Sequence, residues 1–152
     1  MNSSVRGIRN NNPFNIVKSC HNWIGKIKGV DPKFETFDTM YHGIRAGLKL
    51  LITYVERGID TPKKIIARFA PAAENNVDNY VYYICRDSRN IFVISPDERI
   101  KTFKQFCHIC SRICKYENGL NYAESSNFML LPEQLREIID KYDLNKNLVL
   151  TD

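Results

Sequence analysis

Apolar side chains recur every three or four residues along most of this sequence, a spacing that predicts helices with one buried face. The longest such stripe predicts a helix that begins at Ser95, where a capping serine, a first-turn proline and a capping-box glutamate coincide, and that ends just before Gly119. Its apolar positions are Ile100, Phe103, Phe106, Cys107, Cys110, Ile113 and Cys114.

The same spacing predicts four further helices. They run from Asp38 to Gly58, from the Thr61-Pro62 cap to Ala70, from Val77 to Ile84, and from Pro132 to Tyr142. A capping residue followed by proline at the first helical position is a specific start signal. Asp38 is the expected N-cap of the first of these helices.

The first 38 residues follow a different pattern. The run Asn10-Asn11-Asn12-Pro13 is typical of turns, and three short β-prone pieces follow at Phe14–Val17, Trp23–Ile27 and Phe34–Phe37. We therefore expect a mainly α fold of the α+β kind, with a small irregular sheet of two or three strands. The 152 residues suit one domain, with a loop-and-strand segment at 1–38 and a helical part at 39–145.

Glu117 is the most informative single residue. Continuing the long stripe by three from Cys114 or by four from Ile113 reaches Glu117, just before Gly119. Burial and the negative end of a helix dipole both disfavour a charged carboxylate, and a glutamate kept protonated near neutral pH can act as a general acid. The alternative is a helix-end glutamate that reaches out to solvent.

Three other acids are candidate partners, each with a structural alternative. Glu74, in the loop Ala70–Asn76, would be stabilised by the N-terminus of the following helix. Asp38 would serve as a cap, and Glu35 would be exposed on a strand. If a second catalytic carboxylate exists, we rank Glu74 above the other two.

The asparagine-rich segment is a candidate binding surface. Arg9 can bind an anion, and the amides of Asn11, Asn12 and Asn15 can pair with sugar hydroxyl and acetamide groups because each amide both donates and accepts. The alternative is that these asparagines serve only turn formation.

The composition of the chain limits the classes of partner that the protein is expected to bind. A net charge of +5 and a pI near 9 favour anionic partners such as nucleic acid, membrane or cell-wall polymer, or simply a soluble basic surface. No helix concentrates lysine and arginine on one face, so a nucleic-acid partner is not expected. No apolar run is long enough to span a membrane, and the N-terminus lacks the apolar core of a signal peptide, so another factor would have to deliver the protein to a target outside the cytoplasm.

Cofactor chemistry lacks sequence support. Cys107, Cys110 and Cys114 lie on the apolar stripe and are expected in the core. A zinc site built from Cys107, His108 and Cys110 lacks a second Cys/His pair, and five cysteines in this arrangement indicate no disulfide framework. Phosphate-loop and metalloprotease motifs are absent. We therefore expect no metal and no cofactor.

Two groups of motifs resemble a family of small phage and prophage proteins that are called virion structural proteins and look like lysozyme-type murein hydrolases. The first group is Arg6–Ile16, Trp23-x-Gly25, Phe34-x-x-Phe37-Asp38-Thr39 and Gly43–Ala46. The second is Ala70-Pro71-x-x-Glu74-Asn75-Asn76-x-x-x-Tyr80 and Tyr116-Glu117-Asn118-Gly119. The chain departs from the family pattern at Phe14 (glycine expected), Phe69 (tryptophan) and Tyr116 (histidine).

A looser similarity links the chain to lytic transglycosylases and bacterial glucosaminidases, whose catalytic glutamate ends a helix in a Glu-Ser-Gly context. In the glucosaminidases an Asn-Asn-Leu-Phe-Gly-Ile-Lys segment follows the glutamate, whereas the similar segment here, Asn11–Lys18, precedes Glu117. A circular permutation of the lysozyme-like fold would explain this order. The asparagine segment should then lie within about one disaccharide of Glu117.

Together these resemblances imply a lysozyme-like protein that cleaves peptidoglycan glycan strands. Glu117 and Glu74 would be catalytic, and the substrate would contact Arg9, Asn11, Asn12, Asn15, Asn75, Tyr80 and Asn118. The protein would reside in the virion, or in the bacterial cytoplasm at synthesis, and act on the cell wall after delivery. The alternative is a non-catalytic virion or cell-wall-binding protein that keeps the fold, with other virion proteins as partners.

Overall fold

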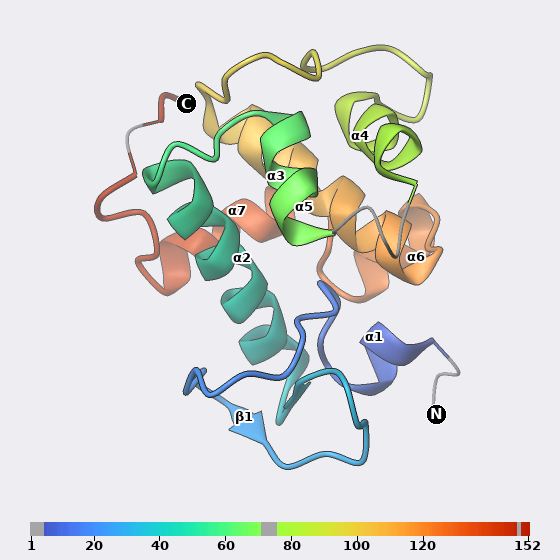
Figure 1. Ribbon diagram of the computed structural model, residues 1–152, viewed down its shortest axis with the longest axis vertical. Coiled ribbons are helices and arrows are strands. Elements are labelled where there is room, and N and C mark those ends of the chain that lie inside the picture. The colour runs from blue at the N-terminus through green and yellow to red at the C-terminus, as the bar shows by residue number, and fades with distance from the viewer. Residues whose placement is uncertain (1–4, 71–75, 149) are drawn as a thin grey trace.

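The computed structural model describes residues 5–70, 76–148 and 150–152 (Figure 1). It confirms a mainly α structure with a small β part. The elements in chain order are α1 (Arg6–Arg9), β1 (Lys26–Ile27), β2 (Thr36–Phe37), α2 (Met40–Glu56), α3 (Pro62–Phe69), α4 (Val77–Cys85), α5 (Phe103–Asn118), α6 (Tyr122–Asn127) and α7 (Pro132–Lys141).

Two helix starts follow the predicted capping signals and one differs by a residue. α3 begins with Pro62 at its first position, and the Thr61 side chain accepts from the backbone N–H of Lys64. α7 likewise begins at Pro132. The cap of α2 is Thr39, which accepts from the His42 N–H, rather than the predicted Asp38.

The predicted start of α5 at Ser95 is wrong. The helix begins at Phe103, where Thr102 and Gln105 form a complete capping box. Between these points the backbone is not helical, and the Ile100 N–H donates to the Asp60 carbonyl at 2.8 Å instead of entering a helix. The Ser95 signal makes only a local turn, in which its N–H donates to the Glu98 carboxylate.

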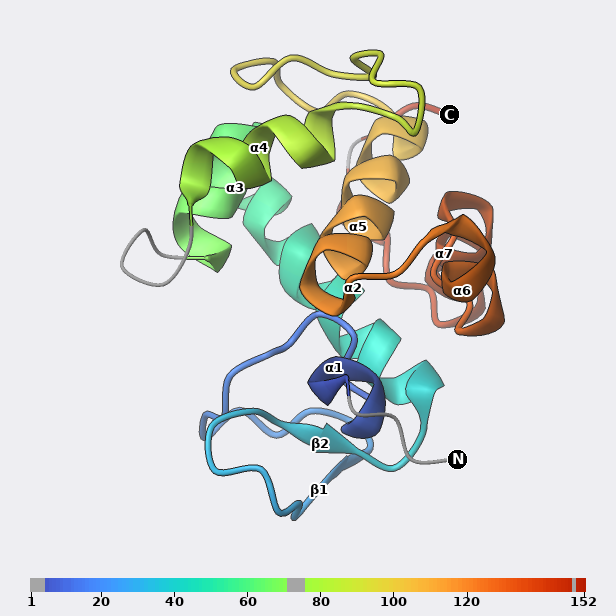
Figure 2. The same ribbon diagram turned by 90° about the vertical axis from the view of Figure 1, so that its right-hand side faces the viewer.

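The sheet has two strands, within the predicted two or three. β1 and β2 pair antiparallel, with Lys26 opposite Phe37. The Phe14–Val17 segment adds a single bridge, from Val17 to Phe34. The sheet, α1 and the connecting loops form an N-terminal lobe below the helices (Figure 2).

α5 occupies the centre of the helical part, with α3 and α4 on one side and α6 and α7 on the other (Figure 2). The predicted stripe is buried, including the three cysteines at 107, 110 and 114, which confirms their core role. Burial raises the pKa of the Cys107 thiol to about 12, so this group is not a ready thiolate at neutral pH.

The loop of the N-terminal lobe that carries the asparagines packs on α2. We call residues 10–16 the asparagine turn. Gly43 and Gly47 lie one helical turn apart on α2, and a β-carbon at these positions would lie 1.7 Å from the Asn11 carbonyl oxygen and 2.0 Å from the Phe14 ring. The two glycines therefore leave the space that the asparagine turn fills.

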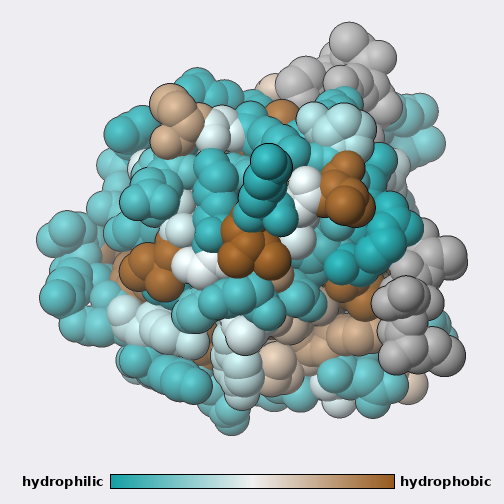
Figure 3. All heavy atoms as spheres, turned by 90° about the horizontal axis from the view of Figure 1, so that it is seen from below, coloured by the Kyte–Doolittle hydropathy of each residue, from teal (hydrophilic) through white to brown (hydrophobic). Residues whose placement is uncertain are grey.

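The lower face of the molecule (Figure 3) is largely hydrophilic, with apolar side chains in separate spots. Among the described residues, no helix combines the length and the apolar character needed to cross a membrane.

The close approach of the asparagine turn to α2 predicts the sign of one substitution. Alanine normally stabilises a helix interior by about 0.5–1 kcal/mol relative to glycine. We expect Gly43→Ala instead to lower the free energy of unfolding by roughly 1–3 kcal/mol, because its methyl group meets a backbone carbonyl. Urea denaturation measures the change.

A matched control is Glu56→Ala, at the exposed end of the same helix. It should change the free energy of unfolding by no more than about 0.5 kcal/mol. A stabilised Gly43→Ala protein would show that the turn does not press on α2.

Candidate functional site

Glu117 lies half-buried in the last turn of α5, and both of its carboxyl oxygens accept hydrogen bonds. The Asn15 side-chain amide donates to Oε1 at 2.9 Å, and the Tyr80 hydroxyl donates to Oε2 at 2.7 Å. These contacts join three segments that are far apart in sequence. They confirm that part of the asparagine segment meets Glu117, as the sequence predicted.

The partners of Glu117 are neutral. Within the part of the chain that the structure describes, no lysine or arginine forms an ion pair with its carboxyl group. A neighbouring cation would favour the ionised form of a carboxyl group. The arrangement around Glu117 therefore fixes its orientation through amide and phenol donors without adding a compensating positive charge.

Tyr80 is fully buried in α4, and its ring stacks on Tyr116 with the ring centres 3.8 Å apart. Burial, reinforced by the negative charge of Glu117, raises the pKa of the Tyr80 phenol far above its usual value. The burial of the ring therefore favours the neutral phenol, whose hydroxyl donates to Glu117 Oε2. The Tyr116 ring stacks on Tyr80 and supports it. Tyr116 occupies the position at which the murein hydrolases that the motifs resemble have histidine.

Asn15 reaches Glu117 from a left-handed backbone conformation, with φ at 53°, which asparagine tolerates better than most residues. The Asn12 side chain holds the turn in shape: its oxygen accepts from the Ile16 N–H, and its amide donates to the carbonyls of Ile16 and Glu35. Asn12 thereby positions Asn15.

Asn118 ties the end of α5 to the same turn. Its amide donates to the carbonyl oxygens of Pro13 and Cys114, both at 2.8 Å, and the side chain is 5% exposed. Gly7 of α1 packs directly against the Asn118 oxygen, where a β-carbon would lie 2.2 Å away. The residue after Glu117 is thus a structural clamp.

The other predicted binding residues divide into three groups. Asn12 and Asn118 are buried and use their donors internally, so they brace the backbone and do not face a ligand. Asn11 is half-buried, with its amide donating to the Phe37 carbonyl, and Arg9 is exposed at the end of α1. Glu74 and Asn75 lie outside the described residues.

The lower-ranked acids take structural roles. Glu35, predicted to be exposed, is only 1% exposed because it pairs with Lys26 at 3.0 Å. Asp38 is exposed and accepts from His42 at 2.6 Å, and this hydrogen bond holds the pKa of Asp38 below its usual value. Their contacts lie within the N-terminal lobe and the start of α2.

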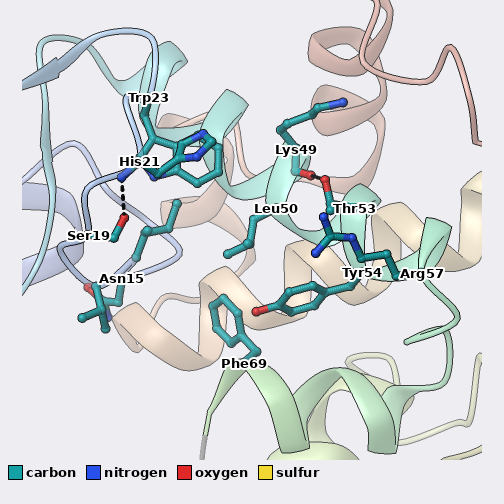
Figure 4. Close-up of a pocket in the computed structure, with 12 residues that line it drawn as sticks. Asn15, Ser19, His21, Trp23, Lys49, Leu50, Thr53, Tyr54, Arg57 and Phe69 are labelled. Carbon is teal, nitrogen blue, oxygen red and sulfur yellow. Dashed lines mark hydrogen bonds between the residues drawn. The ribbon is translucent and has the colours of Figure 1, made fainter.

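Next to Asn15 a cleft of about 500 Å³ opens between the N-terminal lobe and α2 (Figure 4). His21 and Trp23 form one side, and their rings lie 4.0 Å apart. The lining residues are Asn15, Ile16, Val17, Ser19, His21, Trp23, Lys49, Leu50, Thr53, Tyr54, Arg57 and Phe69. The cleft is thus mixed aromatic, aliphatic and basic, and it leads to the residue that holds Glu117.

Sequence reasoning missed the α2 side of this cleft. Lys49 and Arg57 lie off the apolar stripe of their helix, and such positions usually face bulk solvent. They line the cleft only because the N-terminal lobe lies opposite this part of α2. Among the described residues, no group of three or more histidine, cysteine, aspartate or glutamate side chains gathers to hold a metal ion.

The clamp predicts that Asn118→Asp is strongly destabilising. Aspartate keeps the shape but loses both donors and places a carboxylate against two carbonyl oxygens. We expect the free energy of unfolding to fall by at least about 2 kcal/mol, measured by urea denaturation.

Asn147→Asp, at an exposed position, is the matched control and should shift the unfolding free energy by less than about 0.5 kcal/mol. Equal stability of the two variants would contradict the clamp.

Comparison with known proteins identifies a relative of this chain. No family model matches it. The curated "Protein P5" of Pseudoalteromonas phage PM2 is 44% identical over 126 residues, which cover 80% of this chain and 76% of P5. Identity at this level over most of both chains shows common descent and a bacteriophage context. The chain belongs to the family of the phage protein P5.

Proposed function

We propose that this protein cleaves the glycan strand of peptidoglycan, with Glu117 as the general acid. One observation carries the proposal: the half-buried carboxyl group of Glu117 is oriented by Tyr80 and by Asn15, and Asn15 also lines a cleft that contains aromatic residues. Sugar rings bind well to aromatic side chains such as Trp23 and Tyr54, because these offer large flat apolar faces.

In this mechanism Glu117 donates its proton to the oxygen of the glycosidic bond as that bond breaks. Asn15 and Tyr80 hold the carboxyl group in one orientation, which reduces the entropy lost on reaching the transition state. Glu74 remains the first candidate for a second carboxylate. Without one, a group of the substrate itself would complete the reaction, as in transglycosylase-type chemistry.

Membership of a phage protein family supports a role in or with the virion. In this role the protein would act on the cell wall after the virion or another factor delivers it there. Its partners would be peptidoglycan strands and other virion proteins.

A non-catalytic wall-binding virion protein is the second candidate. The observation that favours it is that both Glu117 oxygens already have protein partners. Beside them, Tyr116 stands where the murein hydrolases that the motifs resemble have histidine. Retention on purified sacculi without release of soluble muropeptides would favour this candidate.

The general-acid role predicts that Glu117→Gln abolishes muralytic activity, lowering the turnover of purified sacculi by at least about a hundredfold. The fold should persist, because glutamine can accept from Asn15 and donate to the Tyr80 oxygen. The melting temperature should therefore stay within a few degrees of the wild-type value.

Glu137→Gln, at an exposed position on α7, is the control and should leave turnover unchanged. Wild-type turnover by Glu117→Gln, with the same products, would refute the assignment of Glu117.

A further inference from the structure

One wall of the cleft carries a row of basic and polar side chains. Lys49 and Thr53 lie in α2 and Arg57 is the residue that caps its C-terminus, and the interval of four residues places all three on one side of that helix. Figure 4 shows them along the side of the cleft opposite Asn15. With a rise of 1.5 Å per residue, the row spans about 12 Å, enough to follow a ligand along the cleft.

The two cations of this row lack anionic partners in the described structure. Neither Lys49 nor Arg57 forms an ion pair there, and none of the twelve lining residues is an aspartate or glutamate. Two uncompensated cations beside a concave surface raise the local concentration of anions. The wall is therefore suited to a ligand that carries negative charge.

The opposite walls offer two buried polar atoms without partners. The Asn15 side-chain oxygen and the Trp23 indole nitrogen are both buried, and neither has a hydrogen-bond partner among the described residues. Asn15 itself is only 8% exposed. The protein covers both atoms, so the groups that the cleft presents to a ligand are the two cations and the partly exposed aromatic rings. Figure 4 shows the two residues on adjoining walls of the same cleft.

Building on the proposed function, we propose that the cleft selects glycan strands whose sugars bear carboxylates. Lys49 and Arg57 bind those carboxylates, while the aromatic side chains of the cleft contact the sugar rings. A peptidoglycan strand supplies this chemistry in two ways: a lactyl ether has a free carboxylate where no peptide is attached, and a peptide stem, which is joined to the lactyl carboxyl by an amide bond, brings carboxylates of its own. Arginine is well suited to the task, because its planar guanidinium pairs with a carboxylate through two hydrogen bonds.

Equilibrium binding to three probes of equal saccharide length tests the proposal, using the full chain with Glu117→Gln to prevent turnover. The probes are a neutral N-acetylglucosamine oligomer, a peptide-free glycan fragment with lactyl carboxylates, and a stem-bearing muropeptide. We expect at least one carboxylated probe to bind about tenfold more tightly than the neutral oligomer. Which of the two does so identifies the source of the carboxylate.

Adding Lys49→Gln and Arg57→Gln should bring the carboxylated probes to the affinity of the neutral oligomer, and raising the salt concentration should do the same. Lys101→Gln, just before α5 and away from the cleft lining, is the matched control and should preserve the preference. Equal binding of all probes, no binding, or a preference that survives in the double variant would each overturn the proposal.

The two proposals fail separately. Cleavage of sacculi without any carboxylate preference would leave the catalytic assignment standing and remove this inference. Carboxylate-selective binding by a protein that releases no glycan fragments would support the inference and remove the catalytic assignment.

Discussion

The structure depends on the contact between the end of α5 and the asparagine turn. Asn118 donates to a carbonyl of its own helix and to Pro13, more than a hundred residues earlier in the chain. On the other side of the turn, Gly43 makes room for the backbone of Asn11 and Gly47 makes room for the Phe14 ring, so the turn lies close against α2. The turn is thus fixed from two directions. A buried amide whose carbonyl partners are lost is costly, so this contact also restrains the position of the N-terminal lobe.

The geometry around Glu117 follows from that contact. With the turn fixed, Asn15 projects to Glu117 from one side, while the buried Tyr80 reaches it from the other. Asn15 and Tyr80 are both uncharged, so they orient the Glu117 carboxyl group without an adjacent cation. The position of the N-terminal lobe also forms the cleft. Trp23 and His21 lie opposite α2 because the asparagine turn packs on that helix. Glu117, the cleft and the turn therefore form one unit.

Much of the fold was predictable because its signals are local. The caps at Thr61-Pro62 and Pro132 specify helix starts within a few residues, and the stripe of α5 specifies its buried face. The Ser95 signal failed because a distant carbonyl, that of Asp60, takes the Ile100 N–H that a helix would have used. The central residue, Glu117, was predictable from its position on the stripe. The roles of Asn12 and Asn118 were not, since an asparagine that braces a backbone and one that faces a ligand look alike in sequence. Lys49 and Arg57 belong to the cleft only through tertiary packing.

The proposed function concerns one bond of the glycan strand, so the identity of the products tests it most directly. Mass spectrometry of soluble fragments released from purified peptidoglycan reports which bond has been cut and what end it leaves. Cleavage of the glycan strand predicts fragments cut between sugars, with peptide stems and cross-links intact, and with either a reducing or an anhydro sugar at the new end. Fragments cut within the peptide or between sugar and peptide would contradict it, as would the absence of any released fragment.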